Sequence, residues 1–182
     1  MSNIQLAFDK QKEKGRKAFI PFITAGDPDI ASTKQFVLAL AEEGSTVIEL
    51  GIPFSDPVAD GPTIQAANLR AFKHDIHVDK VLEMVEEVRK TSDVPIVFLM
   101  YANTVYHYGI QAFFKACSKA KVDGVIIPDV PLEEREEFDS VAREYEIDLI
   151  SLVAPTSKER TKAICEGARG SFRHYGMECV GY

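Results

Sequence analysis

The feature that most constrains this chain is the repeated alternation of short apolar segments with longer helical patterns. The apolar segments show little alternation between polar and apolar residues, which is typical of parallel strands that are covered on both faces. Such an order predicts right-handed strand–helix–strand crossovers and a parallel sheet in a single α/β domain over residues 1–182. The segments that we expect to form strands are 18–23, 46–50, 95–100, 124–127 and 147–153.

Helical patterns fill the stretches between these segments. Residues 78–88 carry an apolar stripe at 3.6-residue spacing, and residues 132–145 carry a second one with acidic residues in its first turn. Asp29 is predicted to cap a helix over 30–43 that Gly44 ends. A last helix is expected over 158–166.

Two closures of the sheet fit this pattern, an open doubly wound sheet and a (β/α)₈ barrel. The loop TAGDPD after the first strand has no glycine-rich nucleotide-binding fingerprint, which weakens a dinucleotide-binding interpretation. A complete eight-stranded barrel needs about 250 residues, whereas this chain has 182. The pattern alone supports both closures equally.

The net charge, the lack of long apolar runs and the few cysteines and histidines argue against several classes of function. A net charge of −7 without a cluster of basic residues disfavours a nucleic-acid or anionic-membrane surface. No apolar run is long enough to span a bilayer, and the N-terminus has no apolar signal segment. Three scattered cysteines and four histidines without ligand spacing predict no disulfide framework and no metal site. We expect a cytoplasmic protein.

A candidate general acid or base lies at the end of the second predicted strand. Glu49 is one residue before the end of segment 46–50, and in a barrel the C-terminal strand ends face the active site. A carboxyl between Ile48 and Leu50 is expected to be partly desolvated, which would raise its pKa toward neutrality. A solvated carboxylate at a strand end is the alternative.

A long connection over residues 51–65 follows this strand and is rich in proline and glycine. Connections of this length in α/β units tend to be lids or binding loops. Asp60 lies in it, and its spacing alone favours a turn former or the cap of a helix that begins at Pro62 or Thr63. Asp56 has the same turn-forming interpretation.

Further polar residues follow other predicted strands. Asp27 and Asp129 come directly after strands and are expected to cap the helices that follow them. Tyr101 and Asn103 lie just beyond the third strand, where they could line the mouth of a site. These residues predict an α/β enzyme that uses carboxylates at strand ends, without specifying its substrate.

Four motifs make the chain resemble the tryptophan synthase alpha subunit family from about residue 4 to residue 170. They are PFITAGDP from Pro21, ELGIPFSDPVADGPTIQ from Glu49, LMYAN from Leu99 and PDVP from Pro128. The resemblance implies a (β/α)₈ barrel of the TIM type, of which this chain carries the first five to six strand–helix units.

The same resemblance implies a carbon–carbon lyase of L-tryptophan biosynthesis that cleaves indole-3-glycerol phosphate to indole and glyceraldehyde 3-phosphate by a reverse-aldol reaction. Glu49 would be the general acid–base, and Asp60 would stabilise the indolenine intermediate and handle the proton of the ring nitrogen. The residues that would form the walls around the indole are Phe22, Leu99, Tyr101 and Ile126.

The resemblance also implies a partner. The family needs no metal and no cofactor of its own, because pyridoxal phosphate belongs to the beta subunit, with which the alpha subunit forms an alpha-beta-beta-alpha heterotetramer. The residues on loops that would face this partner are Asp56, Pro57, Asn103 and Pro131.

The similarity to the family is lost after about residue 170. Residues 171–182 form a non-matching tail that preserves neither the expected sixth strand nor the Ser-x-x-Gly-Val-Thr-Gly loop after it. Without the loops that bind phosphate, we expect the 182 residues alone to be inactive. The alternatives are an inactive fragment that only docks on the beta subunit, and a different TIM-barrel enzyme for phosphorylated substrates.

Overall fold

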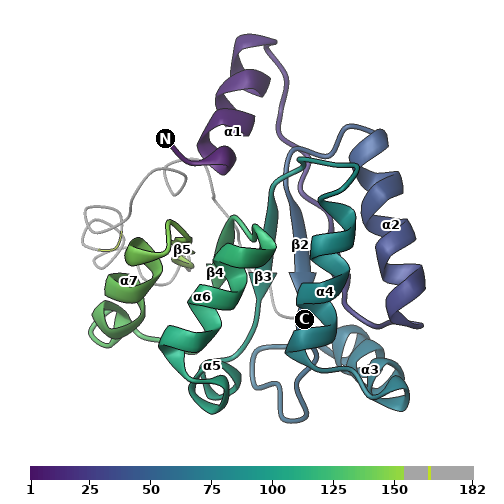
Figure 1. The fold of residues 1–182 in the computed structure, drawn as a ribbon, viewed down its shortest axis with the longest axis vertical. Coiled ribbons are helices and arrows are strands. Elements are labelled where there is room, and N and C mark those ends of the chain that lie inside the picture. Colours follow the sequence, from purple (N-terminus) through teal and green to yellow (C-terminus); the bar gives the residue numbers. More distant parts are fainter. Residues whose placement is uncertain (154–163, 165–182) are drawn as a thin grey trace.

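The computed structural model describes residues 1–153 and residue 164 (Figure 1). The helix predicted over 158–166, apart from residue 164, and the tail 171–182 lie outside the described residues, and the single-domain assignment stays a prediction. The elements follow one another in the order α1 (Asn3–Glu13), β1 (Phe22–Thr24), α2 (Ile30–Glu42), β2 (Ile48–Gly51), α3 (Pro62–Ala71), the 3₁₀ turn η1 (Phe72–His74), α4 (Val78–Val88), β3 (Ile96–Leu99), α5 (Ala102–Tyr108), α6 (Ile110–Ala120), β4 (Gly124–Ile126), α7 (Arg135–Glu144) and β5 (Asp148–Ile150).

The strands form one parallel sheet whose spatial order is the order of the sequence, β1-β2-β3-β4-β5. A doubly wound sheet reverses its strand order at a switch point, whereas a barrel adds each strand beside the previous one. The described strands therefore follow the barrel order. Each predicted apolar segment overlaps one of them, and β1 and β2 each extend one residue beyond their predicted segment. The strands β1, β4 and β5 have only three residues each.

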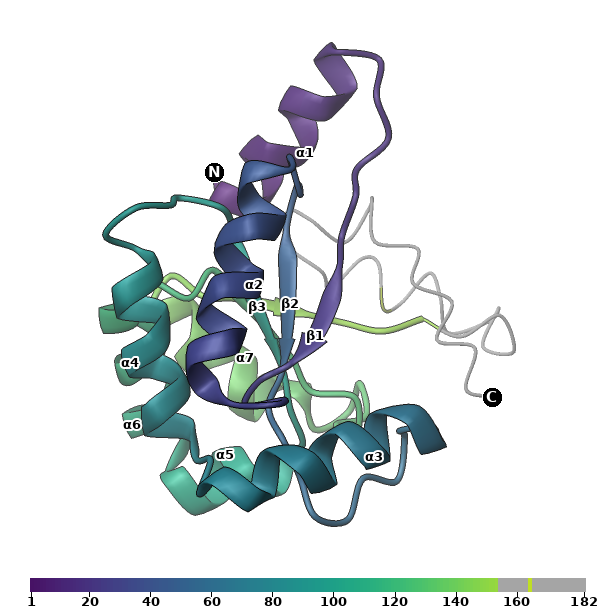
Figure 2. The same ribbon diagram turned by 90° about the vertical axis from the view of Figure 1, so that its right-hand side faces the viewer.

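The outer face of the sheet carries the larger part of the core. Figures 1 and 2 show α2, α4, α6 and α7 on the same side of the sheet. They cover alternate strand residues, among them Ile48, Leu50 and Phe98, which are completely buried. The apolar stripe predicted for residues 78–88 is confirmed in α4, where it lies against this core.

The inner face of the sheet carries a smaller apolar cluster. Val47, Val97 and Ile126 point to this side and pack with Ile4 and Phe8 of α1. Helix α1 lies at the N-terminal ends of the strands, and α3 and α5 lie at their C-terminal ends (Figure 1). The inner face is therefore covered by α1 at one end, while the loops after the strands gather at the other.

Helix α2 begins and ends as the sequence predicts. The Asp29 carboxylate accepts a hydrogen bond of 2.7 Å from the Ser32 backbone N–H, as expected of an N-cap residue. Gly44 follows the helix with a φ of +88°, a conformation that glycine adopts at little cost.

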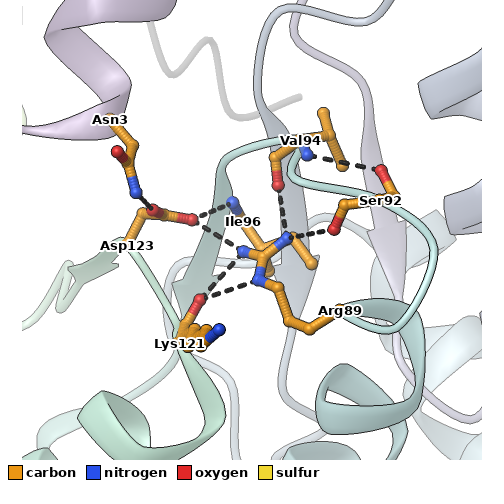
Figure 3. Close-up of polar contacts among 7 residues, drawn as sticks. All are labelled: Asn3, Arg89, Ser92, Val94, Ile96, Lys121 and Asp123. Carbon is orange, nitrogen blue, oxygen red and sulfur yellow. Dashed lines mark hydrogen bonds and ion pairs between the residues drawn. The ribbon is translucent and has the colours of Figure 1, made fainter.

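A buried ion pair joins several elements at the N-terminal end of the sheet (Figure 3). The Arg89 guanidinium donates to Asp123 Oδ2 at 2.7 Å, and both side chains are only 8% exposed. Arg89 also donates to the carbonyls of Lys121 and Val94, and the Asp123 carboxylate also accepts from the Ile96 backbone N–H. Burial raises the pKa of Asp123 and lowers that of Arg89. These contacts connect the end of α4 to β3 and β4, which is a structural role.

Candidate active site

Glu49 lies on the inner face of the sheet. It pairs in register with Phe22 of β1 and Val97 of β3, and paired residues of parallel strands point to the same face. Val97 belongs to the inner cluster, which places Glu49 on the same side. The residue is 3% exposed, so the expected burial of the carboxyl is confirmed, while its raised pKa stays a prediction.

An apolar surface adjoins Glu49 on this face. Leu99 pairs with Gly51 on one side and with Ile126 on the other, two residues closer to the C-terminal strand ends than Glu49. The ring of Phe22 lies over Gly51, where an added Cβ would be 2.5 Å from Phe22 Cζ. The structure thus brings Phe22, Leu99 and Ile126 to one face beside the carboxyl, as a slot for a flat ring would require.

Tyr101 anchors the long loop after β2. Its ring stacks on Phe54, with centroids 5.0 Å apart. Its hydroxyl accepts a hydrogen bond of 2.9 Å from the Ala59 backbone N–H and donates one of 3.1 Å to Asp60 Oδ1. Tyr101 is 2% exposed, and this burial raises its pKa to about 12, so the phenol stays protonated and remains a donor. Tyr101 therefore contacts the loop in addition to lying near the predicted wall of the slot.

The capping role favoured for Asp60 by spacing alone is wrong. Helix α3 begins at Pro62 after Gly61, and no side chain caps it. The Asp60 carboxylate instead accepts hydrogen bonds from Tyr101 and from Asn68 Nδ2, the latter at 3.2 Å. Because proline has no N–H and fixes φ, the helix can start without a side-chain cap, which leaves the carboxylate available for other contacts.

Asn68 was missed by the sequence reasoning. It lies in α3 and is 5% exposed. Nearby in the same helix, Ala67 and Ala71 are also buried, whereas Leu69 is exposed. A buried asparagine needs hydrogen-bond partners, so an amide on the buried face of a predicted helix is the signal that could have identified it.

Two other predicted caps are wrong. Asp27 does not cap α2 but accepts two hydrogen bonds from Arg70 of α3, at 2.8 and 2.7 Å, and these lower its pKa. Asp129 accepts from the backbone N–H of Ala102 at 3.0 Å, so it caps α5, which begins 27 residues before it in the sequence, and not the helix that follows it. Both carboxylates join neighbouring loops at the C-terminal end of the sheet, which fixes α3 and α5 relative to the strands.

The residues predicted to face a partner lie at the surface of this same end. Asp56, Asn103 and Pro131 are exposed and Pro57 is half-buried, on the segments that follow β2, β3 and β4. Their role at an interface stays a prediction.

Within residues 1–153 and at residue 164, no group of three or more histidine, cysteine, aspartate or glutamate side chains could hold a metal ion. In the same part of the chain, no helix is both long and apolar enough to cross a membrane.

Comparison with known proteins gives a consistent result. The family model described as tryptophan synthase alpha chain matches residues 8–176. The tryptophan synthase alpha chain of Caldanaerobacter subterraneus subsp. tengcongensis is 55% identical over 170 residues, which cover 93% of this chain and 65% of that protein. The alpha chain of Lacticaseibacillus casei is 52% identical over 157 residues, 86% of this chain and 59% of that protein.

Solved structures agree with the sequence comparison. The tryptophan synthase subunit alpha of Legionella pneumophila superposes with a TM-score of 0.89 at 40% identity, covering 93% of this chain and 66% of that one. A chain of the tryptophan synthase complex of Pyrococcus furiosus superposes with a TM-score of 0.78 at 43% identity, covering 82% of this chain and 62% of that one. The chain thus spans about 65% of the length of the relatives it matches first.

Proposed function

The chain belongs to the tryptophan synthase alpha chain family, and from this membership we propose that its inner sheet face cleaves indole-3-glycerol phosphate to indole and glyceraldehyde 3-phosphate. The observation that carries the proposal is the buried carboxyl of Glu49 beside an apolar surface, with a second carboxylate, Asp60, held on the loop after the same strand. Two carboxyl groups in different environments are a common way to divide acid and base roles.

The reaction needs protons at defined atoms. Glu49 delivers a proton to the ring carbon that bears the side chain, which forms the indolenine, and then accepts the proton of the side-chain hydroxyl. The carbon–carbon bond breaks, its electron pair returns to the ring, and the hydroxyl carbon becomes the aldehyde of glyceraldehyde 3-phosphate. Asp60 stabilises the positive charge on the ring nitrogen of the indolenine. Phe22, Leu99, Tyr101 and Ile126 form the walls of the slot.

The proposal includes the cofactor and partner expectations of the family. The alpha chain uses no cofactor of its own, and pyridoxal phosphate belongs to a beta subunit that completes an alpha-beta-beta-alpha assembly in the cytoplasm. The Pyrococcus furiosus relatives, one of which is described as part of an α2β2 complex, support such an assembly. Asp56, Pro57, Asn103 and Pro131 would lie at this interface.

A second candidate function is docking on the beta subunit without catalysis. It is favoured by the exposure of Asp56, Asn103 and Pro131 on the segments that follow β2, β3 and β4. Membership of the family leaves no support for a different barrel enzyme of phosphorylated substrates.

One experiment separates the two candidates. The 182-residue chain and the protein encoded by the complete reading frame around it are each purified and mixed with the beta subunit, and substrate loss is compared with release of both products. Equal amounts of indole and glyceraldehyde 3-phosphate from either protein support the lyase. Complex formation by both proteins without any product would replace it with the docking function.

A further inference from the structure

We infer that Asn68 is a positioning residue which, together with Tyr101, fixes the carboxylate of Asp60 for its part in the reaction. The inference rests on the proposed function and adds to it a residue outside the predicted site. Asn68 acts through Asp60 and is not itself assigned a contact with substrate.

The geometry gives each oxygen of the Asp60 carboxylate its own donor. Oδ1 accepts from the Tyr101 hydroxyl at 3.1 Å, and Oδ2 accepts from Asn68 Nδ2 at 3.2 Å. The two donors come from separate parts of the fold, since Tyr101 lies between β3 and α5 and Asn68 lies in α3. Two donors on two oxygens determine the direction of the carboxylate and also the rotation of its plane.

The loop itself offers little restraint on Asp60. Ser55, Asp56, Val58 and Ala59 are exposed, and Asp60 is half-buried. A side chain at the end of such a segment rotates unless other groups hold it. The Asp60 carboxylate can stabilise the charge on the ring nitrogen of the indolenine only when it is held in one orientation. Restraint must therefore come from outside the loop.

Asn68 can supply this restraint because its helix is itself held in place. Its neighbours Ala67 and Ala71 are buried, and Arg70 makes two hydrogen bonds to Asp27 in the loop after β1. Asn68 is 5% exposed, so its amide has little access to water. An amide is also a donor at every pH and takes no proton from Asp60, which suits a carboxylate that must remain charged.

The test measures steady-state cleavage of indole-3-glycerol phosphate by the protein from the complete reading frame, with beta subunit present. In Asn68→Ala, kcat is expected to fall roughly ten- to a hundredfold, the effect of one lost hydrogen bond to a charged group. KM should change less than about threefold, because the interaction acts on the transition state more than on substrate binding.

Gln65→Ala is the matched control. Gln65 Nε2 donates to the backbone carbonyl of the same Asp60 at 2.8 Å, and it lies in the same helix. The substitution therefore removes a bond to Asp60 without removing a donor to the carboxylate. Its kcat should stay within about twofold of the unaltered protein.

Asn68→Asp adds a readout that a purely structural role would not change. It keeps the size of the side chain but places a second carboxyl against Asp60, and two such groups share one proton at low pH. The shared proton restores a donor, so the deficit in kcat relative to the unaltered protein should narrow as the pH falls. This variant also decides the question if Asn68→Ala does not fold.

The outcomes are distinct. Equal kcat in Asn68→Ala and Gln65→Ala, or a deficit in Asn68→Asp that does not change with pH, would overturn the inference and leave the proposed function standing. Failure of the unaltered protein to cleave the substrate would refute the proposed function, and the inference with it.

Discussion

Gly51→Ala tests the close approach of β2 to the ring of Phe22. An added Cβ would lie 2.5 Å from Phe22 Cζ and 2.8 Å from Cε2. Carbon atoms in ordinary contact are about 3.5–4.0 Å apart, so the ring must retreat by roughly 1 Å. Crowding of this kind costs about 1–3 kcal/mol. Replacing glycine by alanine within a strand also stabilises the folded state by about 0.5–1 kcal/mol, because alanine loses less conformational entropy on folding. The expected net loss of stability is therefore about 1 kcal/mol.

The physical cause predicts a change of sign in a second background. In Phe22→Ala the ring is absent, so Gly51→Ala meets no obstacle and should be neutral or stabilising by about 0.5–1 kcal/mol. The double-mutant cycle is measured by urea unfolding of the unaltered protein, the two single variants and the double variant. Their free energies of unfolding are compared provided that the m-values are equal. The same loss of stability in both backgrounds would refute the assigned contact and, with it, the position of Phe22 over the proposed slot.

Three further predictions follow from individual hydrogen bonds and from burial. Tyr101→Phe keeps the stack on Phe54 but removes the acceptor of the Ala59 amide, so hydrogen exchange at that amide should become about tenfold faster or more; unchanged exchange would contradict the anchor. Thr33→Val should lower the free energy of unfolding, measured in urea, by about 1–3 kcal/mol, because the Thr33 hydroxyl accepts a hydrogen bond from the buried Gly26 N–H at 2.9 Å. Thr33→Ser keeps a hydroxyl and should lose less stability; equal losses of stability in the two variants would contradict this explanation. Burial raises the pKa of Asp148, so the folded state holds that proton more tightly than the unfolded chain, and stability is lost as the pH rises from about 4 through the folded value. Asp148→Asn should therefore unfold at higher urea than the unaltered protein at pH 7 but not at pH 3, and a gain of equal size at both pH values would refute the assignment.

The order of elements could be predicted from the sequence because it depends on local patterns. Nearly continuous apolar segments predict buried parallel strands, and Asp29 and Gly44 act within one turn of the helix that they delimit. The local pattern left the closure of the sheet open, because closure depends on which strands pair. The family resemblance predicted a barrel, and the sequential pairing of β1 to β5 agrees with that prediction.

The site was predictable where a residue acts from its own strand. Glu49 is buried because strand periodicity places it beside Phe22 and Val97. Three carboxylates on loops, those of Asp27, Asp60 and Asp129, were misassigned, because each one bonds to an element distant in the sequence. Asp27 reaches Arg70, 43 residues away, and Asp60 reaches Tyr101, 41 residues away. Local cap and turn preferences carry no information on such contacts.

Substitution of Glu49 by glutamine tests the central claim most directly. Glutamine has nearly the same shape but can neither donate an acidic proton nor accept one, and a general acid–base group contributes roughly 10²–10⁴-fold to rate. With the protein from the complete reading frame and the beta subunit, we predict that Glu49→Gln loses at least about a hundredfold in kcat for indole release. Binding of the substrate, measured by calorimetry, should remain within a few fold. Turnover near that of the unaltered protein would contradict the role of Glu49 and the assignment of the inner sheet face as a lyase site.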